Sequence, residues 1–488
     1  MDFLDPKKQK AHARRLALGY ALIGLVLLLG TTILLYLAYG FGLDKNGRVI
    51  QNGLVFISSQ PAGADIYING TQKDTTNTRV VLPAGSYTAE IKRSGYDTWK
   101  RAITVEGGSV ERFDYPFLFP TKLATTVTKQ YAAAPSLMSQ SQDRRWLLTQ
   151  GAASDTFEIY DLNAQKPTPK QLAVSTDLYA PQTVTKGWEA IEWADDNRHV
   201  VLRRTYDKSG QKGTEYILFD RDTPAASQNL GTVLGANPTA IELRNHKYDQ
   251  YYLFDQNAGQ VLTASLKKPT PQSYIKDVLE FKSDGDRLLY VTEDGAPDGK
   301  VNIKLRDEEK AYTLRQAPKS AQYLIKIGRY NGGLLVAAGS QSEDKVYVYS
   351  NPLDTLKNKD EDKRVLVPVQ ILKVDDPNYL SFSTNARFVM AENGDRIAVY
   401  DAERDKGYAY QIKTPVDPGL GHATWMDGFH LTVTSAGKLQ AFDFDGANAR
   451  TLMPSSPTAT PYFDRNYDFV YVVSPANALT STALTIQQ

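Results

Sequence analysis

The sequence contains no cysteine, and this absence excludes several kinds of chemistry at once. Without thiols the chain forms no disulfide, no iron–sulfur cluster and no cysteine-ligated zinc site, and it has no thiol nucleophile. Its stability must come from packing. At 488 residues, 42% of them hydrophobic, the chain can build more than one large core, so we expect two or more folded units.

The sequence also lacks an excess of charge of either sign. Its 56 lysine and arginine residues are balanced by 55 aspartate and glutamate residues, which gives a formal net charge of +1. No basic stretch interleaved with aromatic residues occurs after residues 1–15. We expect no nucleic-acid partner, because phosphate binding depends on clustered cations.

The motifs of common enzymes are missing as well. The G-x-S-x-G motif of serine hydrolases does not occur, since TSAGK around Ser435 lacks the first glycine. FDFDGANAR around Asp443 lacks the third acidic position and the final glutamate of a calcium loop. The histidines are His12, His199, His246, His422 and His430. They have no HxH or HExxH spacing, so we expect no metal, no cofactor and no catalytic residue, and no ligand-binding residue can be named.

One stretch, KGWEAIEWADD, has the residue types of a sugar site. It places Glu189 and Glu192 between Trp188 and Trp193, and such sites use rings for stacking and paired carboxylates for acid and base catalysis. Positions three apart on a strand face opposite sides, so the two carboxylates should not converge. The most favoured interpretation of the stretch is an ordinary strand without a binding site. Glycan binding is the next, and glycosidase or lyase chemistry is the least favoured.

The longest feature that is present is an apolar run. Residues 16–43 carry no charge and are long enough to cross a bilayer as a helix. Residues 1–15 include KKQKAHARR, and the positive-inside rule then places this flank in the cytoplasm and the later domains outside it. A cleaved signal peptide is the alternative, but the run is about twice the usual apolar core and no small-x-small site follows. We expect a single-pass membrane anchor.

A linker, 44–53, leads to short alternating segments at 54–118. In SSQPAGADIYINGTQ, Pro61 and Gly63 indicate a turn, and Asn69-Gly70 is the strongest two-residue hairpin signal, because a type I′ turn needs positive φ at both positions. Alternation continues in GSYTAEIK. These patterns predict a small all-β sandwich.

The same residues resemble the PEGA domain. The four-residue signature reads PAGA at 61–64, with Ala62 in place of glutamate, and IYING, LPAGSYT and SGYDTWKRAITV follow where that family has its turns and closing strands. The resemblance implies a small extracytoplasmic module of bacterial or archaeal surface proteins. It does not imply catalysis.

From residue 121 to 488 a repeated unit returns about every 46 residues, which is the size of a four-stranded propeller blade. Its apolar strands are RWLLT, HVVLR, YYLFD, RLLYV, LLVAA, RFVMA, FHLTV and FVYVV. Second strands such as FEIYDL and RIAVYD follow most of them, and these pairs resemble TolB-like and Trp-Asp-repeat β-propellers. Eight blades are favoured; seven are possible, because the step from Tyr251 to Arg287 is short.

Two segments of this region carry further expectations. KLATTVTKQ, at 122–130, could supply the missing outer strand of the final unit and so close the ring, because an open ring would leave an unpaired sheet edge. The charged run DTLKNKDEDKR, at 354–364, is expected to be a solvated loop.

The fold class is therefore all-β behind one membrane helix. We expect a non-enzymatic, membrane-anchored, extracytoplasmic binding or scaffold protein that presents its propeller to a protein or an envelope glycan. One alternative is a propeller enzyme acting on glycans or peptides through carboxylates scattered over several blades. Another is an envelope-assembly or sensing component. Oligomeric state is not predicted.

Overall fold

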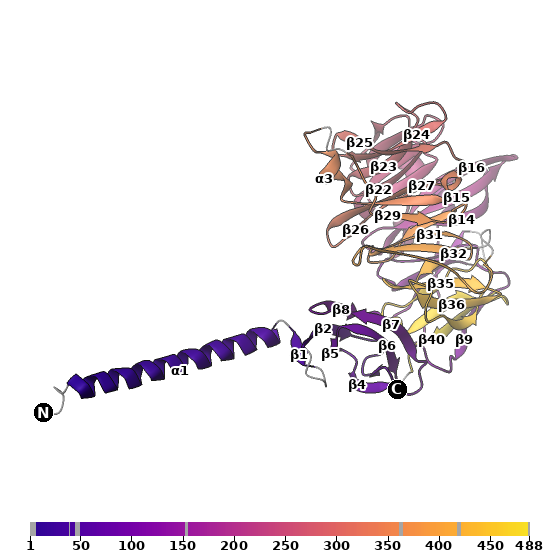
Figure 1. Cartoon of the computed structure of the whole chain (residues 1–488). Coiled ribbons are helices and arrows are strands. Elements are labelled where there is room, and N and C mark those ends of the chain that lie inside the picture. Colours follow the sequence, from indigo (N-terminus) through magenta and orange to yellow (C-terminus); the bar gives the residue numbers. More distant parts are fainter. Residues whose placement is uncertain are drawn as a thin grey trace. The chain divides into compact units, whose positions relative to one another are not determined.

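The computed structural model describes residues 6–38, 40–43, 49–151, 155–360, 365–416 and 421–486 (Figure 1). The chain divides into two compact units, Met1–Lys122 and Leu123–Gln488. The second unit begins two residues after the predicted start of the propeller at residue 121. The backbone N–H of Thr121 donates to the carbonyl of Gly95 at 2.9 Å, which ties this residue to the first unit.

The first unit begins with helix α1 (Pro6–Ala38). Its segment His12–Tyr36 has a mean hydropathy of 2.3, and none of the segment is buried. By length and composition this segment suits a membrane anchor or a signal sequence.

The limits of α1 differ from the predicted helix at 16–43. The helix starts ten residues earlier, inside the basic flank, and residues Phe41–Leu43 form strand β1, which pairs with the start of β2 (Val49–Ile57). Gly40 has a φ of 74°, a conformation that ends the helix. Strand β2 starts at Val49, so the linker predicted at 44–53 contains part of a strand. Residues 44–48 and Tyr39 lie outside the described residues. Absence of charge marks an apolar segment, but it does not mark where a helix stops.

Two four-stranded sheets follow, as predicted for a small sandwich. One has the order β1-β2-β5 with β8 parallel to β2, and the other has the order β4-β3-β6-β7. The remaining strands are β3 (Asp65–Ile68), β4 (Thr71–Thr75), β5 (Thr78–Pro83), β6 (Gly85–Lys92), β7 (Trp99–Val105) and β8 (Val110–Phe113). The predicted type I′ turn is confirmed, with φ of 49° at Asn69 and 78° at Gly70. Alternating residues such as Val55, Ile66 and Ile91 form the core.

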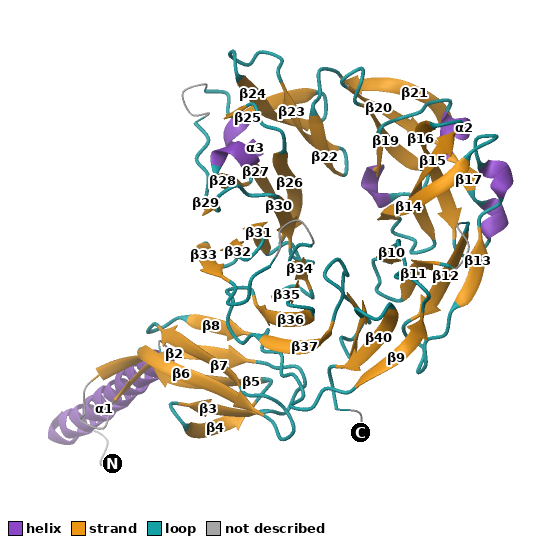
Figure 2. Ribbon diagram, turned by 90° about the vertical axis from the view of Figure 1, so that its right-hand side faces the viewer, coloured by secondary structure: helices purple, strands orange, loops and turns teal. Residues whose placement is uncertain are grey.

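The described part of the second unit is a β-propeller of eight four-stranded antiparallel sheets, numbered one to eight in chain order. Figure 2 shows them around a ring, with first strands such as β10, β14, β22 and β34 toward its centre. Sheets one to four contain β10 (Met138–Gln140), β11 (Trp146–Gln150), β12 (Thr156–Asp161), β13 (Lys170–Ala173); β14 (Val184–Trp193), β15 (His199–Lys208), β16 (Gln211–Asp220), β17 (Gln228–Asn229); β18 (Ala240–Leu243), β19 (Gln250–Asp255), β20 (Gln260–Ser265), β21 (Lys268–Ile275); and β22 (Glu280–Asp284), β23 (Arg287–Thr292), β24 (Lys300–Asp307), β25 (Lys310–Pro318). Sheets five to eight contain β26 (Tyr323–Tyr330), β27 (Gly333–Ser340), β28 (Lys345–Ser350), β29 (Gln370–Lys373); β30 (Tyr379–Phe382), β31 (Phe388–Asn393), β32 (Arg396–Asp401), β33 (Lys406–Gln411); β34 (Thr424–Trp425), β35 (His430–Ser435), β36 (Lys438–Asp443), β37 (Arg450–Pro454); and β38 (Tyr462–Phe463), β39 (Phe469–Val473), β40 (Ala478–Ala483), β9 (Thr125–Gln130).

Each of the eight predicted apolar strands is the second strand of a different sheet. The short step that raised the alternative of seven units, from Tyr251 to Arg287, separates β19 from β23, which belong to sheets three and four. Short α-helices connect some strands, α2 (Leu230–Leu234) and α3 (Pro352–Leu356), and 3-10 turns lie at Thr176–Leu178, Pro224–Ala226, Arg244–His246 and Gln341–Glu343. Helix α3 overlaps only the first three residues of the loop predicted at 354–364, because Leu353 and Leu356 pack on one buried side of a turn that Pro352 starts. Residues 357–360 are irregular and mostly exposed, as predicted. Residues 361–364 lie outside the described residues.

The predicted closing strand is confirmed. Strand β9, from the start of the second unit, pairs with β40 and completes sheet eight, in the register Gln130 to Ala478 and Thr125 to Thr482. The hydroxyl groups of Thr125 and Thr482 lie 2.8 Å apart. Lys129 also forms an ion pair with Glu158 of sheet one, whose side chain is buried, so the closing strand binds the sheets on both sides of the seam.

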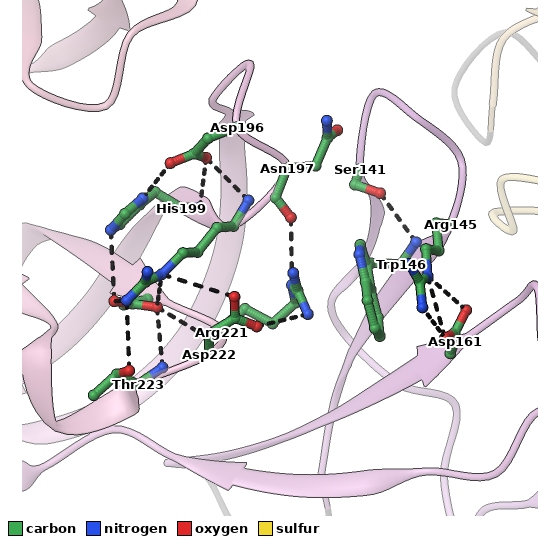
Figure 3. Close-up of polar contacts among 12 residues, drawn as sticks. Ser141, Arg145, Trp146, Asp161, Asp196, Asn197, His199, Arg221, Asp222 and Thr223 are labelled. Carbon is green, nitrogen blue, oxygen red and sulfur yellow. Dashed lines mark hydrogen bonds and ion pairs between the residues drawn. The ribbon is translucent and has the colours of Figure 1, made fainter.

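A repeated polar turn joins neighbouring sheets (Figure 3). In sheet two the carboxylate of Asp196 accepts the backbone N–H of Arg198 and of His199, at 2.9 and 3.0 Å, and contacts Nδ1 of His199 at 2.6 Å. The next residue after β16, Arg221, places its guanidinium 3.8 Å from the ring centroid of Trp146 in sheet one. This turn fixes the second strand and packs it against the preceding sheet.

Sheets six and seven repeat the arrangement. Asp427 accepts the backbone N–H of Phe429 and His430, both at 2.7 Å, and contacts Nδ1 of His430 at 2.7 Å. Phe444, in the place of the arginine, stacks on Phe388 of sheet six with 4.4 Å between ring centroids. The D-x-x-H motif therefore stabilises the turn before the second strand and its packing against the preceding sheet.

Candidate functional site

A cavity of about 210 Å³ lies beside the first strands of sheets six and seven. Its described lining consists of Tyr379, Gly421, His422, Thr424, Thr432, Val433, Thr434, Pro457, Thr458, Ala459, Thr460 and Pro461. Aromatic, imidazole and hydroxyl groups thus meet a loop that leads from β37 to β38. A concave site with a few convergent polar groups is the usual form of a small-ligand site.

Strand register places the two rings of this cavity. Tyr379 is the first residue of β30, and it lies opposite Glu392 near the end of β31. His422 comes just before β34 of the next sheet. The rings of Tyr379 and His422 stack almost in parallel, with 4.2 Å between centroids and 5° between planes. Two sheets therefore each supply one half of this stack.

Glu392 supports the stack from below the surface. Its side chain is fully buried, and its oxygens accept the backbone N–H of Ala423 at 3.1 and 3.0 Å. Nδ1 of His422 lies 2.8 Å from the same carboxylate. Burial raises the pKa of Glu392, while the contacts with His422 and Ala423 oppose that rise.

This geometry leaves His422 with one ring nitrogen for a ligand. When Glu392 is ionised it can only accept, so Nδ1 donates to it; Nε2 is then an acceptor in the neutral ring and a second donor in the charged ring. The imidazole side chain is 34% exposed, against 0% for Glu392. Burial, and then the charge of Glu392, raise the pKa of Tyr379, so its phenol stays protonated and can donate a hydrogen bond.

Threonine hydroxyl groups complete the polar part of the lining. Oγ1 of Thr424 and Oγ1 of Thr432 lie 2.9 Å apart across the strand pair, and Thr432 also donates to the carbonyl of Thr424. Oγ1 of Thr434 lies 2.8 Å from Oγ of Ser455. These groups can accept hydrogen bonds from a hydroxylated ligand and donate hydrogen bonds to it.

The other residues weighed in the sequence lie elsewhere. His199 and His430 belong to the polar turns described above, and His12 lies in α1. Ser435 is buried and donates to the carbonyl of Pro415 at 2.8 Å. Asp443 is buried and accepts from the side-chain amide of Asn448 at 2.8 Å. Across the described residues no group of three or more histidine and acidic side chains is arranged to hold a metal ion.

The stretch with sugar-site residue types is structural. Trp188 and Trp193 are both buried in the core between sheets one and two. The carboxylates do not converge, as predicted: Glu189 pairs with Arg203, and Glu192 accepts the backbone N–H of Leu243 in sheet three at 2.8 Å.

Glu192 also contacts Nδ1 of His246, at 2.6 Å, and this contact raises the pKa of that histidine. Glu242 repeats the role one sheet later, where it accepts the backbone N–H of Ser283 at 3.1 Å. Glutamates on the first strands therefore tie neighbouring sheets together around the ring.

Sequence reasoning missed Glu392 and Tyr379, and it considered His422 only as one of the histidines that lack metal-ligand spacing. Tyr379 and Glu392 meet because their strands pair, and His422 joins them because the next sheet packs alongside. The spacing of these residues in the sequence does not indicate that they are in contact. Only a repeat alignment that fixed the strand register would have placed the first two opposite each other.

Comparison with known proteins finds one family model that matches part of the first unit. Residues 52–118 match the family model of the PEGA domain, so this part of the chain is a PEGA domain. The chain is thus a β-propeller protein that carries a PEGA domain behind an apolar helix. No curated protein matches it.

Solved structures that resemble the chain are β-propellers of low similarity. Hsv2 of Kluyveromyces lactis is 9% identical, with a TM-score of 0.38 over 66% of this chain and 98% of that one. The Dos1 propeller is 11% identical, with a TM-score of 0.41 over 74% and 94%. The dihydro-heme d1 dehydrogenase NirN is 14% identical, with a TM-score of 0.40 over 66% of each chain. Nothing about ligands or partners carries over at this level of likeness.

Proposed function

We propose that this protein is a membrane-anchored, extracytoplasmic binding protein whose propeller holds a hydroxylated ligand, the end of an envelope glycan, in the cavity between sheets six and seven. The observation that carries the proposal is the stack of Tyr379 on His422 above a buried carboxylate. A sugar ring uses aromatic faces for its apolar side and fixed donors and acceptors for its hydroxyl groups. The threonine lining supplies the latter.

Topology is part of the same proposal. The basic residues of the N-terminal flank end at Arg15, before the uncharged part of α1, which favours a cytoplasmic N-terminus. The PEGA domain resembles modules found outside the cytoplasm. Protease added to intact cells should then remove the propeller and leave the helix in the membrane. A propeller that stays intact until the cells are opened contradicts this arrangement.

Binding without turnover is proposed because the described lining offers no second carboxylate. Hydrolysis of a glycoside uses two carboxyl groups on opposite sides of the bond. Here Glu392 lies beneath the rings and already accepts three hydrogen bonds. It can orient the imidazole, as second partners of histidine commonly do.

The binding experiment uses the full chain in detergent and a panel of envelope glycan fragments. His422→Ala should abolish retention of the bound fragment, because it removes half of the stack and one hydrogen-bonding nitrogen. His246→Ala is the matched control: this histidine also pairs with a glutamate, is 57% exposed, and lies outside the cavity. Equal binding by both variants would contradict the site.

The same panel tests the enzymatic alternative. Each fragment is recovered after incubation and checked for cleavage by mass spectrometry. Cleavage by the wild-type chain that Glu392→Gln abolishes would replace binding by catalysis. A ligand that proves to be a protein would keep the site but change the partner, and His422→Ala should still weaken that contact.

A further inference from the structure

The PEGA domain has one exposed sheet face that is apolar. Val81 on β5 is 60% exposed and Val110 on β8 is 56% exposed. Register places them on either side of Leu54 on β2, since Leu54 pairs with Val81 along one edge and with Val110 along the other. Three aliphatic side chains therefore form a row across three strands, directed away from the core.

The next row adds an aromatic ring between two cations. Phe56 of β2 pairs with Arg79 of β5 and with Arg112 of β8. The guanidinium of Arg112 lies 4.8 Å from the centroid of the Phe56 ring. We call the two rows together, Leu54, Phe56, Arg79, Val81, Val110 and Arg112, the apolar face.

The outer face of the other sheet is different in kind. Its strands β6 and β7 present polar side chains, and Glu90 forms ion pairs with Lys92 at 2.8 Å and Lys100 at 3.1 Å. Hydrogen bonds from Lys92 and then Lys100 lower the pKa of Glu90. Thr104 is exposed on the same side. This is an ordinary hydrated surface, so the apolar face is a property of one sheet and not of the domain.

The apolar face is also close, along the chain, to the apolar helix. Only four residues separate Tyr36, the end of the candidate span, from Phe41 of β1, and the two rings stack at 5.3 Å between centroids. The hydroxyl of Tyr36 donates to the carbonyl of Gly42 at 3.0 Å, and Gly42 pairs with Ile50 of β2. Leu54 lies four residues further along that strand, about 13 Å at ~3.3 Å per residue. A strand that runs along the bilayer surface would keep the whole face within the headgroup layer.

We propose that the apolar face lies on the membrane surface, with Leu54, Phe56, Val81 and Val110 in the interface and Arg79 and Arg112 paired to anionic lipid headgroups. Guanidinium groups bind phosphates in a two-pronged geometry, and aromatic and aliphatic side chains between cations are typical of surfaces that rest on lipid. A second copy fits less well, because a twofold contact through this face would bring like charges together. The inference rests on the proposed membrane anchor.

The absence of cysteine makes a clean test possible, because one introduced thiol is the only one to label. The full chain carries a single environment-sensitive fluorophore at Val81→Cys, Val110→Cys, Thr104→Cys or Leu27→Cys and is reconstituted in vesicles of phosphatidylcholine with phosphatidylglycerol. Spin-labelled lipid serves as the quencher. Thr104→Cys is the control on the opposite sheet, and Leu27→Cys reports on the span. Unfolding curves of the labelled chains should match that of the wild type.

Quenching should be strongest at Leu27, several-fold weaker but clear at Val81 and Val110, and absent at Thr104. The double change Arg79→Glu and Arg112→Glu should reduce quenching at Val81 to the level of Thr104 and leave Leu27 unchanged. Vesicles of phosphatidylcholine alone should give an intermediate signal at Val81.

Two results overturn the inference in distinguishable ways. Strong quenching at Leu27 with none at Val81 and Val110 means that the anchor is correct and the apolar face is not on the membrane. No quenching at Leu27 means that the proposed anchor itself fails. A probe at Val81 that is already shielded in detergent, without lipid, means that protein covers the face, which also contradicts the proposal.

Discussion

Two histidines eight residues apart, His422 and His430, each contact a carboxylate, and the two pairs are built in opposite ways. In the pair of His430 with Asp427 the histidine side chain is only 3% exposed, and Asp443 approaches its other nitrogen at 3.5 Å. In the pair of His422 with Glu392 the carboxylate is the buried partner and the histidine is 34% exposed. The contact distances, 2.7 and 2.8 Å, are nearly equal.

The difference teaches that the buried partner decides what such a pair is for. A histidine enclosed between two aspartates can only stabilise the turn that contains it, and sheet two repeats that turn with His199. A histidine held from behind by a buried glutamate keeps part of its ring exposed, which the proposed binding site requires. Distance alone would not separate the two cases.

The largest expected effect comes from His430→Ala. Removing one partner of a buried ion pair leaves the other charge without compensation, which costs about 3–5 kcal/mol. Chemical unfolding of the full chain in detergent, followed by tryptophan fluorescence, measures the loss. His199→Ala is the control and should cost less, because Asp196 is 34% exposed and water can solvate it. Equal losses would show that burial does not distinguish the two turns.

The pH dependence of the same pair is the second prediction. Asp427 raises the pKa of His430 above 6.5, so the stabilisation is fully present below about pH 6.5 and is lost as the pH rises through the folded-state pKa. The pKa of Asp427 is lowered from 3.8, so its part is present above that value and is lost as the pH falls through its own folded-state pKa. The difference in unfolding free energy between the wild type and His430→Gln should be greatest between these limits. A difference that grows above pH 8 would contradict this assignment.

A smaller effect on stability is expected for Glu392→Gln. The amide keeps an oxygen to accept the backbone N–H of Ala423, and burial already disfavours the charge, as the raised pKa of Glu392 shows. We expect a change of about 1 kcal/mol or less in unfolding free energy. Ligand retention should fall clearly, because the glutamine no longer fixes the ring of His422. Calorimetry on the ligand from the glycan panel measures this, with Glu192→Gln as the matched variant outside the cavity.

The smallest expected effect on stability belongs to His422→Ala. The ring is partly exposed, its ion pair is screened, and Glu392 can take up a proton once the imidazole is gone, so the loss should be about 0–1 kcal/mol. Thermal unfolding of the full chain checks it. A loss as large as that of His430→Ala would mean that both pairs are structural and would remove the basis of the proposed site.

The sequence predicted the strands that carry most of the buried apolar surface. The second strand of every propeller sheet was identified, because runs such as RFVMA stand out against polar turns. First strands were missed where they are short or polar; β34 and β38 have two residues each, and neither forms a recognisable apolar run. Strand β9 was found despite its polar residues only because closure of the ring required a partner for β40.

The candidate site could not be predicted in the same way. Tyr379 and Glu392 are opposite each other through strand register, and His422 reaches them from the next sheet. The repeated unit was the only feature of the sequence that could have indicated this contact. It shows which residues are equivalent between sheets only when every strand of each sheet is known. The turn that holds His199 and His430 was partly visible, since a polar residue regularly precedes the apolar strand.

The closing strand sets the order in which this molecule can be completed. Thr125 leaves the ribosome long before Thr482, its partner across sheet eight, so the edge formed by β9 must wait through the synthesis of the whole propeller. Contacts of such long sequence separation slow folding and leave a strand edge open to wrong pairing. The threonines and the lysine of TTVTKQ suit that interval, because polar and charged residues on an edge strand discourage association with other chains. The segment therefore closes the ring of the folded propeller, and before closure its polar residues reduce association with other chains.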